Sequence, residues 1–384
     1  MERLAYQALM PTKVIFGVGS IARTGDETAQ LGTKALVVTG TSAMRSLGFT
    51  AMVEKSLSGK GIPYELFEEI ETNPSTASVE EGVKTARDRG CDVIIGLGGG
   101  SAVDAAKAIA SSAGLGIPVV DLMQNGMPRK GLPCLAIPTT AGTGAEVTHI
   151  SVLTIRESKR KDALRSPHNF PTVAILDPAL TLKLPPYITA NTGVDALAHA
   201  MEAYTSRQAH PISDLYARKA MSLVNQYLRR AVLYGDDMEA RTGMMLASNL
   251  AGMAIANAGT AAAHGMAMTI GGICNTDHGT TVGLALPAVL EYNLAANLEK
   301  HRDIAALLGE NVEGMSLRQA AGMAAQAVRT LLNDVNLPLR LRDIGVTEET
   351  LPQLLADTKT QRAWLNNPRP VSPEDMERLL RQTF

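Results

Sequence analysis

The chain has few cysteines and few aromatic residues. Its 384 residues include only three cysteines, which lie far apart. That pattern excludes a disulfide framework and a cysteine-rich zinc knuckle, so we expect free thiols in a reducing compartment. Aromatic residues make up 4% of the chain and the formal net charge is -2. We therefore expect no nucleic-acid partner, because both base-stacking side chains and a basic surface are lacking.

Long apolar runs are also missing. No stretch approaches the roughly 20 apolar residues that cross a membrane, and the first residues lack the charged-then-apolar pattern of a secretion signal. We therefore expect a cytoplasmic protein without membrane contact. The hydrophobic share of 45% and the charged share of 19% are typical of a globular enzyme. The length suggests about two domains.

Strand and helix patterns alternate in the first half of the sequence. Lys34–Thr39 and Cys91–Leu97 are apolar segments typical of buried strands, whereas Ala51–Lys60 and Val79–Arg89 have helical spacing. This alternation predicts a parallel sheet with both faces covered. From about Thr189 onward only helical periodicity is found. The long periodic segments are Ile212–Tyr234, Met238–Ala258, Ser316–Val335 and Glu374–Leu380.

Prolines between Asp177 and Pro186 interrupt both patterns, and we place the domain boundary there. The prediction is an α/β domain over residues 1–184 and an all-helical domain over residues 185–384.

Four residues of the second half suit a divalent metal ion. Asp195 and His199 are four positions apart, so a helix places them on one face. His264 and His278 would complete an N3O set suited to Fe(II) or Zn(II). The alternative is a surface pair of Asp195 and His199 without metal. Apolar neighbours favour the metal, because polar groups in apolar surroundings need partners.

Two glycine-rich loops are candidates for binding phosphate. Gly98-Gly99-Gly100-Ser101 lies between a buried strand and a predicted helix, where backbone can approach a pyrophosphate and the helix N-terminus favours an anion. A plain tight turn is the alternative. Gly17-Val-Gly19 follows the short strand Lys13–Phe16, but the acidic residue expected about twenty positions later is missing. We favour the first loop, and the hydroxyl-rich segment 138–146 offers further cofactor contacts.

A phosphate-binding α/β half and a metal-binding helical half point to a nucleotide-dependent oxidoreductase. The motifs resemble the iron-containing (group III) alcohol dehydrogenase family over essentially the whole chain, as far as Asn367-Pro-Arg369. The segments that carry this resemblance are Gly98–Ser101 with Asp104 and Lys107, 138–143, 193–199, His264-Gly-Met-Ala and His278-Gly.

The resemblance implies a Rossmann-like N-terminal domain and an all-helical C-terminal domain, an architecture shared with dehydroquinate synthase. It implies that Asp195, His199, His264 and His278 bind Fe(II), with Zn(II) as a substitute. It also implies a nicotinamide cofactor, NAD(H) or NADP(H). By the same resemblance, the cofactor contacts are Gly98, Gly99, Gly100, Ser101, Asp104, Thr139, Thr140, Thr143, Val152 and Lys161.

The implied activity is that of a metal-dependent alcohol dehydrogenase or aldehyde reductase, with hydride passing between NAD(P)(H) and a primary alcohol or aldehyde. Open alternatives are an acid-bearing aldehyde as substrate, hydroxyacid–oxoacid transhydrogenation and glycerol dehydrogenase-like polyol oxidation. A dehydroquinate synthase-like lyase needs a strongly charged pocket, whereas 257–268 is almost uncharged. A scaffold protein with a vestigial fold would have lost ligands that are all present here. We expect a small-molecule partner and a homo-oligomer, either a dimer or larger.

The chain departs from the family pattern after the second strand. Many members carry an acidic residue there that binds the ribose 2′-hydroxyl, whereas this chain has Gly40-Thr41-Ser42. Glycine and two hydroxyls leave room and donors for a 2′-phosphate. We therefore expect NADP(H) to be accepted at least as well as NAD(H).

The substrate pocket is expected to differ as well. Met268 stands where relatives usually have a histidine, so we expect proton transfer through water or a cofactor hydroxyl instead of imidazole. Ile255 and Thr260 stand where a bulkier aromatic and a bulkier aliphatic residue are common, and Ala363 replaces a frequent cysteine. We therefore expect a pocket that is roomier or differently polar. Arg362 is a candidate partner for an anionic substrate tail, with a solvated surface arginine as the alternative. The expected pocket residues are Ile255, Thr260, Met268, Arg362 and Trp364.

Overall fold

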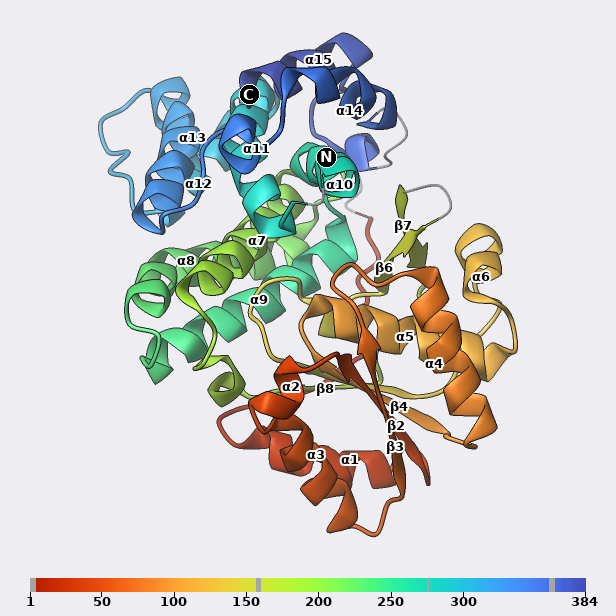
Figure 1. Ribbon diagram of the computed structural model, residues 1–384. Helices are drawn as coiled ribbons and strands as arrows, with labels where there is room; N and C mark the ends of the chain where they lie inside the picture. The colour runs from red at the N-terminus through yellow and green to blue at the C-terminus, as the bar shows by residue number, and fades with distance from the viewer. Residues whose placement is uncertain (1–4, 157–159, 275, 359–362) are drawn as a thin grey trace. The chain divides into compact units, whose positions relative to one another are not determined.

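A computed structural model describes residues 5–156, 160–274, 276–358 and 363–384 (Figure 1). They form two compact units. The α/β unit consists of Met10–Thr140 and Gly144–Leu182. The helical unit consists of Lys183–Phe384, together with Ala141–Thr143 and the described residues that precede Met10.

The α/β unit is built on a parallel six-stranded sheet in the order β1-β8-β5-β4-β2-β3. The prediction of a parallel sheet is confirmed. The strands are β1 (Lys13–Phe16), β2 (Ala35–Gly40), β3 (Tyr64–Ile70), β4 (Val93–Gly98), β5 (Cys134–Pro138) and β8 (Val173–Leu176). The helices are α1 (Thr24–Ala29), α2 (Ala43–Ser46), α3 (Phe49–Ser58), α4 (Thr76–Asp88), α5 (Gly100–Leu115) and α6 (Val119–Asn125).

Central strands of the sheet are almost entirely apolar because helices cover both faces (Figure 1). Leu36 and Val38 of β2 pack in one core cluster with residues of α4 and α5. Ala35 and Val37 pack in a second cluster with residues of α3. Successive side chains of a strand point to opposite faces, so a strand buried on both sides has no polar alternation.

A second, antiparallel pair of strands was not predicted. It consists of β6 (Ile150–Ile155) and β7 (Arg160–Arg165). The sequence of β7 contains four charged residues among six, so it lacks the continuous apolar run by which the buried strands were recognised.

His149, next to β6, gives the α/β unit a predicted sensitivity to acid. Burial, with Lys107 and Arg165 nearby, lowers the pKa of His149 to about 4, and its ring packs against Phe170. The folded state therefore excludes a proton that the unfolded chain binds below pH 6.5, so stability falls between pH 6.5 and about 4. His149→Phe keeps a ring but cannot charge. In metal-free protein, we expect the variant to gain about 2 kcal/mol relative to wild type over this window, measured by denaturant unfolding at each pH. If the free energies of unfolding of wild type and variant change with pH in parallel, this prediction is wrong.

Throughout its described residues, the second unit forms helices and turns without a strand, which confirms the predicted all-helical second half. The long periodic segments correspond to helices within one or two residues at each end. The helices are α7 (Pro186–Thr205), α8 (Pro211–Leu233), α9 (Met238–Ala258), α10 (Ala262–Cys274), α11 (His278–Asn293), α12 (Leu298–Leu307), α13 (Leu317–Asp334), α14 (Leu351–Thr358) and α15 (Pro373–Gln382).

Short 3-10 turns connect many of these elements. They are η1 (Ser20–Arg23), η2 (Ala145–Val147), η3 (Pro178–Thr181), η4 (Leu294–Ala296), η5 (Leu341–Ile344), η6 (Glu348–Thr350) and η7 (Ala363–Asn366).

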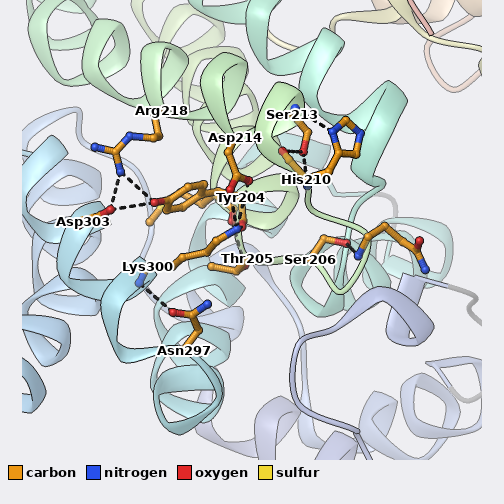
Figure 2. Close-up of polar contacts among 12 residues, drawn as sticks. Tyr204, Thr205, Ser206, His210, Ser213, Asp214, Arg218, Asn297, Lys300 and Asp303 are labelled. Atoms are coloured by element: carbon orange, nitrogen blue, oxygen red, sulfur yellow. Dashed lines mark hydrogen bonds and ion pairs between the residues drawn. The ribbon is translucent and has the colours of Figure 1, made fainter. Parts of the chain in front are cut away.

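A polar network fixes the C-terminal end of α7 (Figure 2). The Tyr204 hydroxyl donates to Asp303 Oδ2 at 2.9 Å and accepts from Arg218 at 2.9 Å. Lys300 donates to the Tyr204 carbonyl oxygen and to Asp214, and its ammonium lies 4.4 Å from the centre of the Tyr204 ring. The network joins α7 to α8 and α12, so the helix is held at the end that follows Asp195 and His199.

All three cysteines are free thiols, as predicted. Among the described residues, no single helix is long and apolar enough to cross a membrane. Only α5 and α6 taken together reach that length and composition, and they are bent by 91° at the break between them.

Candidate metal and cofactor sites

Helix α7 carries two of the four predicted metal ligands on one face. Asp195 and His199 are one turn apart, and both are buried, with exposed fractions of 3% and 6%. This burial rules out the alternative of a solvated surface pair. The Gly142 carbonyl oxygen lies 3.4 Å from His199 Nδ1. If that nitrogen donates to it, His199 Nε2 keeps its lone pair for a metal.

The other two ligands come from neighbouring helices. His264 lies in the first turn of α10, and His278 is the first residue of α11. Hydrogen bonds tie the start of α11 to α7: Asn191 accepts from the Thr280 N–H at 2.7 Å, and Tyr187 donates to Asp277 at 2.7 Å. These bonds set the position of His278 relative to α7.

The three imidazoles surround one carboxylate oxygen. Asp195 Oδ1 lies 3.8 Å from His199 Nε2, 3.6 Å from His264 Nε2 and 3.7 Å from His278 Nε2. Ligand atoms of Asp195, His199 and His264 all lie within 4.8 Å of one another. Ligands about 2.1 Å from a tetrahedral ion are roughly 3.4 Å apart. The observed spacing is close to that value.

The donor set fits a metal by a further observation. Asp195 Oδ1 and His264 Nε2 are buried, and neither has a hydrogen-bond partner among the described residues. Buried polar atoms of this kind normally have a partner, and a divalent ion would supply it for both. A carboxylate with imidazoles is also a ligand set that Fe(II) and Zn(II) accept.

Electrostatic coupling within the cluster is strong. Burial raises the pKa of Asp195, but the three histidines outweigh burial and lower it, so the carboxylate is ionised. Burial lowers the pKa of His199, which favours the neutral ring that a metal requires. Burial also lowers the pKa of His264, yet Glu202 and Asp195 together raise it to about 9.

Glu202 was not predicted as a functional residue. It lies seven positions after Asp195, two helical turns along the same face of α7. Its carboxylate oxygen is 2.5 Å from His264 Nδ1 and it is 2% exposed. The spacing of 195, 199 and 202 is the signal in the sequence that could have identified it.

The predicted pocket residues belong to the helical unit, but their contact with substrate is untested. Ile255 is buried on α9, and Thr260 lies in the turn before α10. Trp364 of η7 packs against Gly265, where an added Cβ would come within 3.0 Å of the indole nitrogen. Met268 is partly exposed, one turn after His264. Arg362 lies outside the described residues.

The favoured glycine loop leads from β4 into α5. Gly98 has a φ of 147°, and a Cβ there would lie 2.9 Å from the Ala102 side chain, so only glycine fits. Gly99 is the N-cap of the 16-residue helix α5. By contrast, the loop at Gly17 leads into the four-residue turn η1. The Gly98 loop thus has the longer helix behind it, as an anion-binding loop requires.

Three of the predicted cofactor segments meet at one edge of the sheet. Parallel strands β5, β4 and β2 are neighbours, with Gly98 opposite Pro138 and Thr39 opposite Leu97. Their carboxyl ends therefore place Thr139 and Thr140, the Gly98 loop, and Gly40–Ser42 side by side. The Thr139 N–H donates to the Gly98 carbonyl oxygen at 2.9 Å. Such an edge is where open α/β sheets bind ligands.

The remaining predicted cofactor residues lie in three places. Asp104 of α5 accepts from the Val152 N–H at 2.9 Å and pairs with the buried Lys107 at 2.9 Å, so α5 is fixed to β6. Lys161 of β7 donates to Asn73 at 2.9 Å. Thr143 belongs to the helical unit.

Comparison with known proteins gives a consistent picture. The family model described as iron-containing alcohol dehydrogenase matches residues 11–178, and its C-terminal counterpart matches 189–384. The 1,3-propanediol dehydrogenase of Citrobacter freundii is 37% identical over 392 residues, covering 100% of both chains. The lactaldehyde reductase of Escherichia coli (strain K12) is 37% identical, covering 98% of this chain and 99% of its own.

Solved structures agree with these relatives. A crystal structure of a 1,3-propanediol oxidoreductase has a TM-score of 0.96 and 37% identity, covering 99% of this chain and 100% of that one. An alcohol dehydrogenase from Oenococcus oeni has a TM-score of 0.96 and 34% identity, with coverage of 99% and 100%. Since family models and relatives match nearly the whole length, the chain belongs to the iron-containing alcohol dehydrogenase family.

Proposed function

We propose that the protein is a metal-dependent alcohol dehydrogenase or aldehyde reductase that acts on a primary alcohol or aldehyde with NAD(P)(H). The observation that carries this proposal is the arrangement of three imidazole Nε2 atoms around the buried Asp195 Oδ1. Family membership and the names of the relatives support the reaction class.

The metal would be held by Asp195, His199, His264 and His278, and the cofactor by the residues at the carboxyl edge of the sheet. When bound, a divalent ion supplies Lewis-acid chemistry to the substrate oxygen, and the nicotinamide gives or takes the hydride. The chain's own part is to orient both. Asp195 and the imidazoles would hold the ion. Asp195 and His199 of α7 and His264 of α10 are buried, so water has little access to these three side chains.

Iron is the expected metal. Zn(II) is a competent substitute, because the reaction needs no change of the metal's oxidation state and the ligand set suits either ion. For the cofactor, we infer that NADP(H) is accepted at least as well as NAD(H). The neutral Gly40-Thr41-Ser42 segment supports this, since Thr41 and Ser42 are exposed hydroxyls at the end of β2. Two further properties remain predictions, a cytoplasmic location and a homo-oligomer, the latter measurable by analytical ultracentrifugation.

A reconstitution assay tests the proposal. The protein is stripped with a chelator, reloaded with Fe(II) or Zn(II), and assayed on a panel of primary alcohols and aldehydes that includes 1,3-propanediol and lactaldehyde, with NADH and NADPH. We expect turnover only in the loaded protein. Equal turnover by the stripped protein, or none on any member of the panel after verified loading, would contradict the proposal.

A further inference from the structure

The buried carboxylate of Glu202 takes part in three hydrogen bonds. Oε2 accepts from the Ala261 N–H at 2.9 Å and lies 2.5 Å from His264 Nδ1, while Oε1 accepts from the Ala263 N–H at 2.6 Å. All three groups belong to the start of α10. A side chain of α7 thus serves as the N-terminal cap of another helix and contacts the ring of a predicted ligand at the same time.

The contact with His264 has a chemical consequence. An imidazole binds a metal through one nitrogen, and the hydrogen bond of the other nitrogen decides which one that is. Because an ionised carboxylate can only accept, Glu202 holds a proton on His264 Nδ1. Nε2 is then the nitrogen left to bind a metal, which displaces the proton there; Nε2 lies 3.6 Å from Asp195 Oδ1 and has no hydrogen-bond partner among the described residues.

We propose that Glu202 is a positioning residue that fixes the tautomer and the orientation of His264 for metal binding. This inference rests on the proposed function, since it takes the cluster to be the metal site. Asp195, His199 and Glu202 occupy positions i, i+4 and i+7 of α7, so one helix face supplies two ligands and the support of a third. The backbone bonds to Ala261 and Ala263 prevent Glu202 from turning away.

Glu202→Gln is the informative substitution, because it keeps the size and removes the charge. A glutamine presents N–H donors where the carboxylate accepted, so it cannot satisfy both backbone donors and His264 Nδ1. Loss of a carboxylate behind a ligating histidine typically weakens metal binding roughly 10- to 100-fold. We expect a loss of that size in Zn(II) affinity, measured by competition with a chromophoric chelator.

The matched control is Asp237→Asn. Asp237 caps α9 by accepting from the Ala240 N–H at 3.0 Å, and it pairs with Arg230, but no ligand is among its contacts. Both substitutions weaken a helix cap in the same unit. We therefore expect Asp237→Asn to lower stability while leaving Zn(II) affinity within about twofold of wild type.

A spectroscopic readout separates positioning from a purely structural role. In Zn(II)-loaded wild type, the His264 Nδ1 proton should give a low-field NMR signal that exchanges slowly with water, because Glu202 holds it in a buried bond. In Glu202→Gln this signal should shift or disappear. Weaker Zn(II) binding with an unchanged His264 signal would refute the positioning role.

The outcomes distinguish this inference from the function on which it rests. Wild-type protein that binds no Zn(II) would refute the metal site itself. Wild-type binding together with unchanged affinity and an unchanged signal in Glu202→Gln would refute only the role of Glu202. If Glu202→Gln does not fold, the wild-type spectrum decides, because a rapidly exchanging His264 Nδ1 proton contradicts the proposal.

Discussion

His264→Ala should bind no stoichiometric metal and should lower kcat/KM by a factor on the order of a thousand. The substitution removes one residue from the proposed four-ligand set, and Lewis-acid activation by a metal is worth several kcal/mol, which corresponds to about 10³ in rate. Metal content by elemental analysis and initial rates on the best substrate of the panel would measure both effects. Added Zn(II) should raise the unfolding midpoint of the wild type but not that of the variant.

His301→Ala is the control for this experiment. His301 is a fully buried histidine of the same unit, on α12, with its Nδ1 2.8 Å from the Asn297 carbonyl oxygen. Its removal should destabilise the fold without loss of metal. A His264→Ala protein that retains full metal and full turnover would show that His264 is not a ligand.

Gly40→Asp should lower kcat/KM with NADPH by roughly 10- to 100-fold, while kcat/KM with NADH changes by less than about threefold. A carboxylate close to a 2′-phosphate repels it by about 1–3 kcal/mol at an exposed position, after allowance for screening. The new side chain fits, because Gly40 does not have a positive φ and a Cβ there would meet only the Ile70 carbonyl oxygen, at 3.4 Å. Steady-state kinetics with both cofactors would give the two ratios.

Gly40→Asn separates charge from size in this test. The amide is as large as the carboxylate but neutral, so NADPH use should remain near the wild-type level. Higher salt should also narrow the gap between NADPH and NADH in Gly40→Asp, because screening weakens the repulsion. If the wild type uses only NADH, and Gly40→Asp leaves the cofactor ratio unchanged, another residue determines the choice.

Periodicity was enough to predict most of the fold. Helix α9 begins and ends at the predicted residues, and β1 matches as well. An apolar pattern with caps or glycines at its ends indicates both the type of element and where it begins and ends. The β6–β7 pair was missed because its pairing is antiparallel and one strand is rich in charge. Neither a continuous apolar run nor strand–helix alternation marks such a pair.

Within the candidate site, spacing indicated the ligands but not their surroundings. Asp195 and His199 could be read from one helix, whereas the alternative of a surface pair could be excluded only by the observed burial of α7 on nearly all sides. The spacing could have placed Glu202 on the same helix face as Asp195 and His199, but its contact with His264 depends on where α10 begins in space and could not be predicted from the sequence. The contact of Trp364 with Gly265 likewise joins segments about a hundred residues apart, which no local pattern reveals.

The seven-residue interval from Asp195 to Glu202 also sets how α7 can vary in length. Each residue of an α-helix turns the chain by about 100°, so inserting or deleting one residue inside this interval would rotate Glu202 away from His264 while Asp195 stayed in place. A conservative substitution between these residues, at a position other than His199, leaves the angular relation of the three side chains unchanged, whereas a change of length does not. Beyond Ser206, where the helix has ended, an insertion would not alter the angular relation of the three side chains. The length of this stretch is therefore constrained in addition to the identity of Asp195, His199 and Glu202.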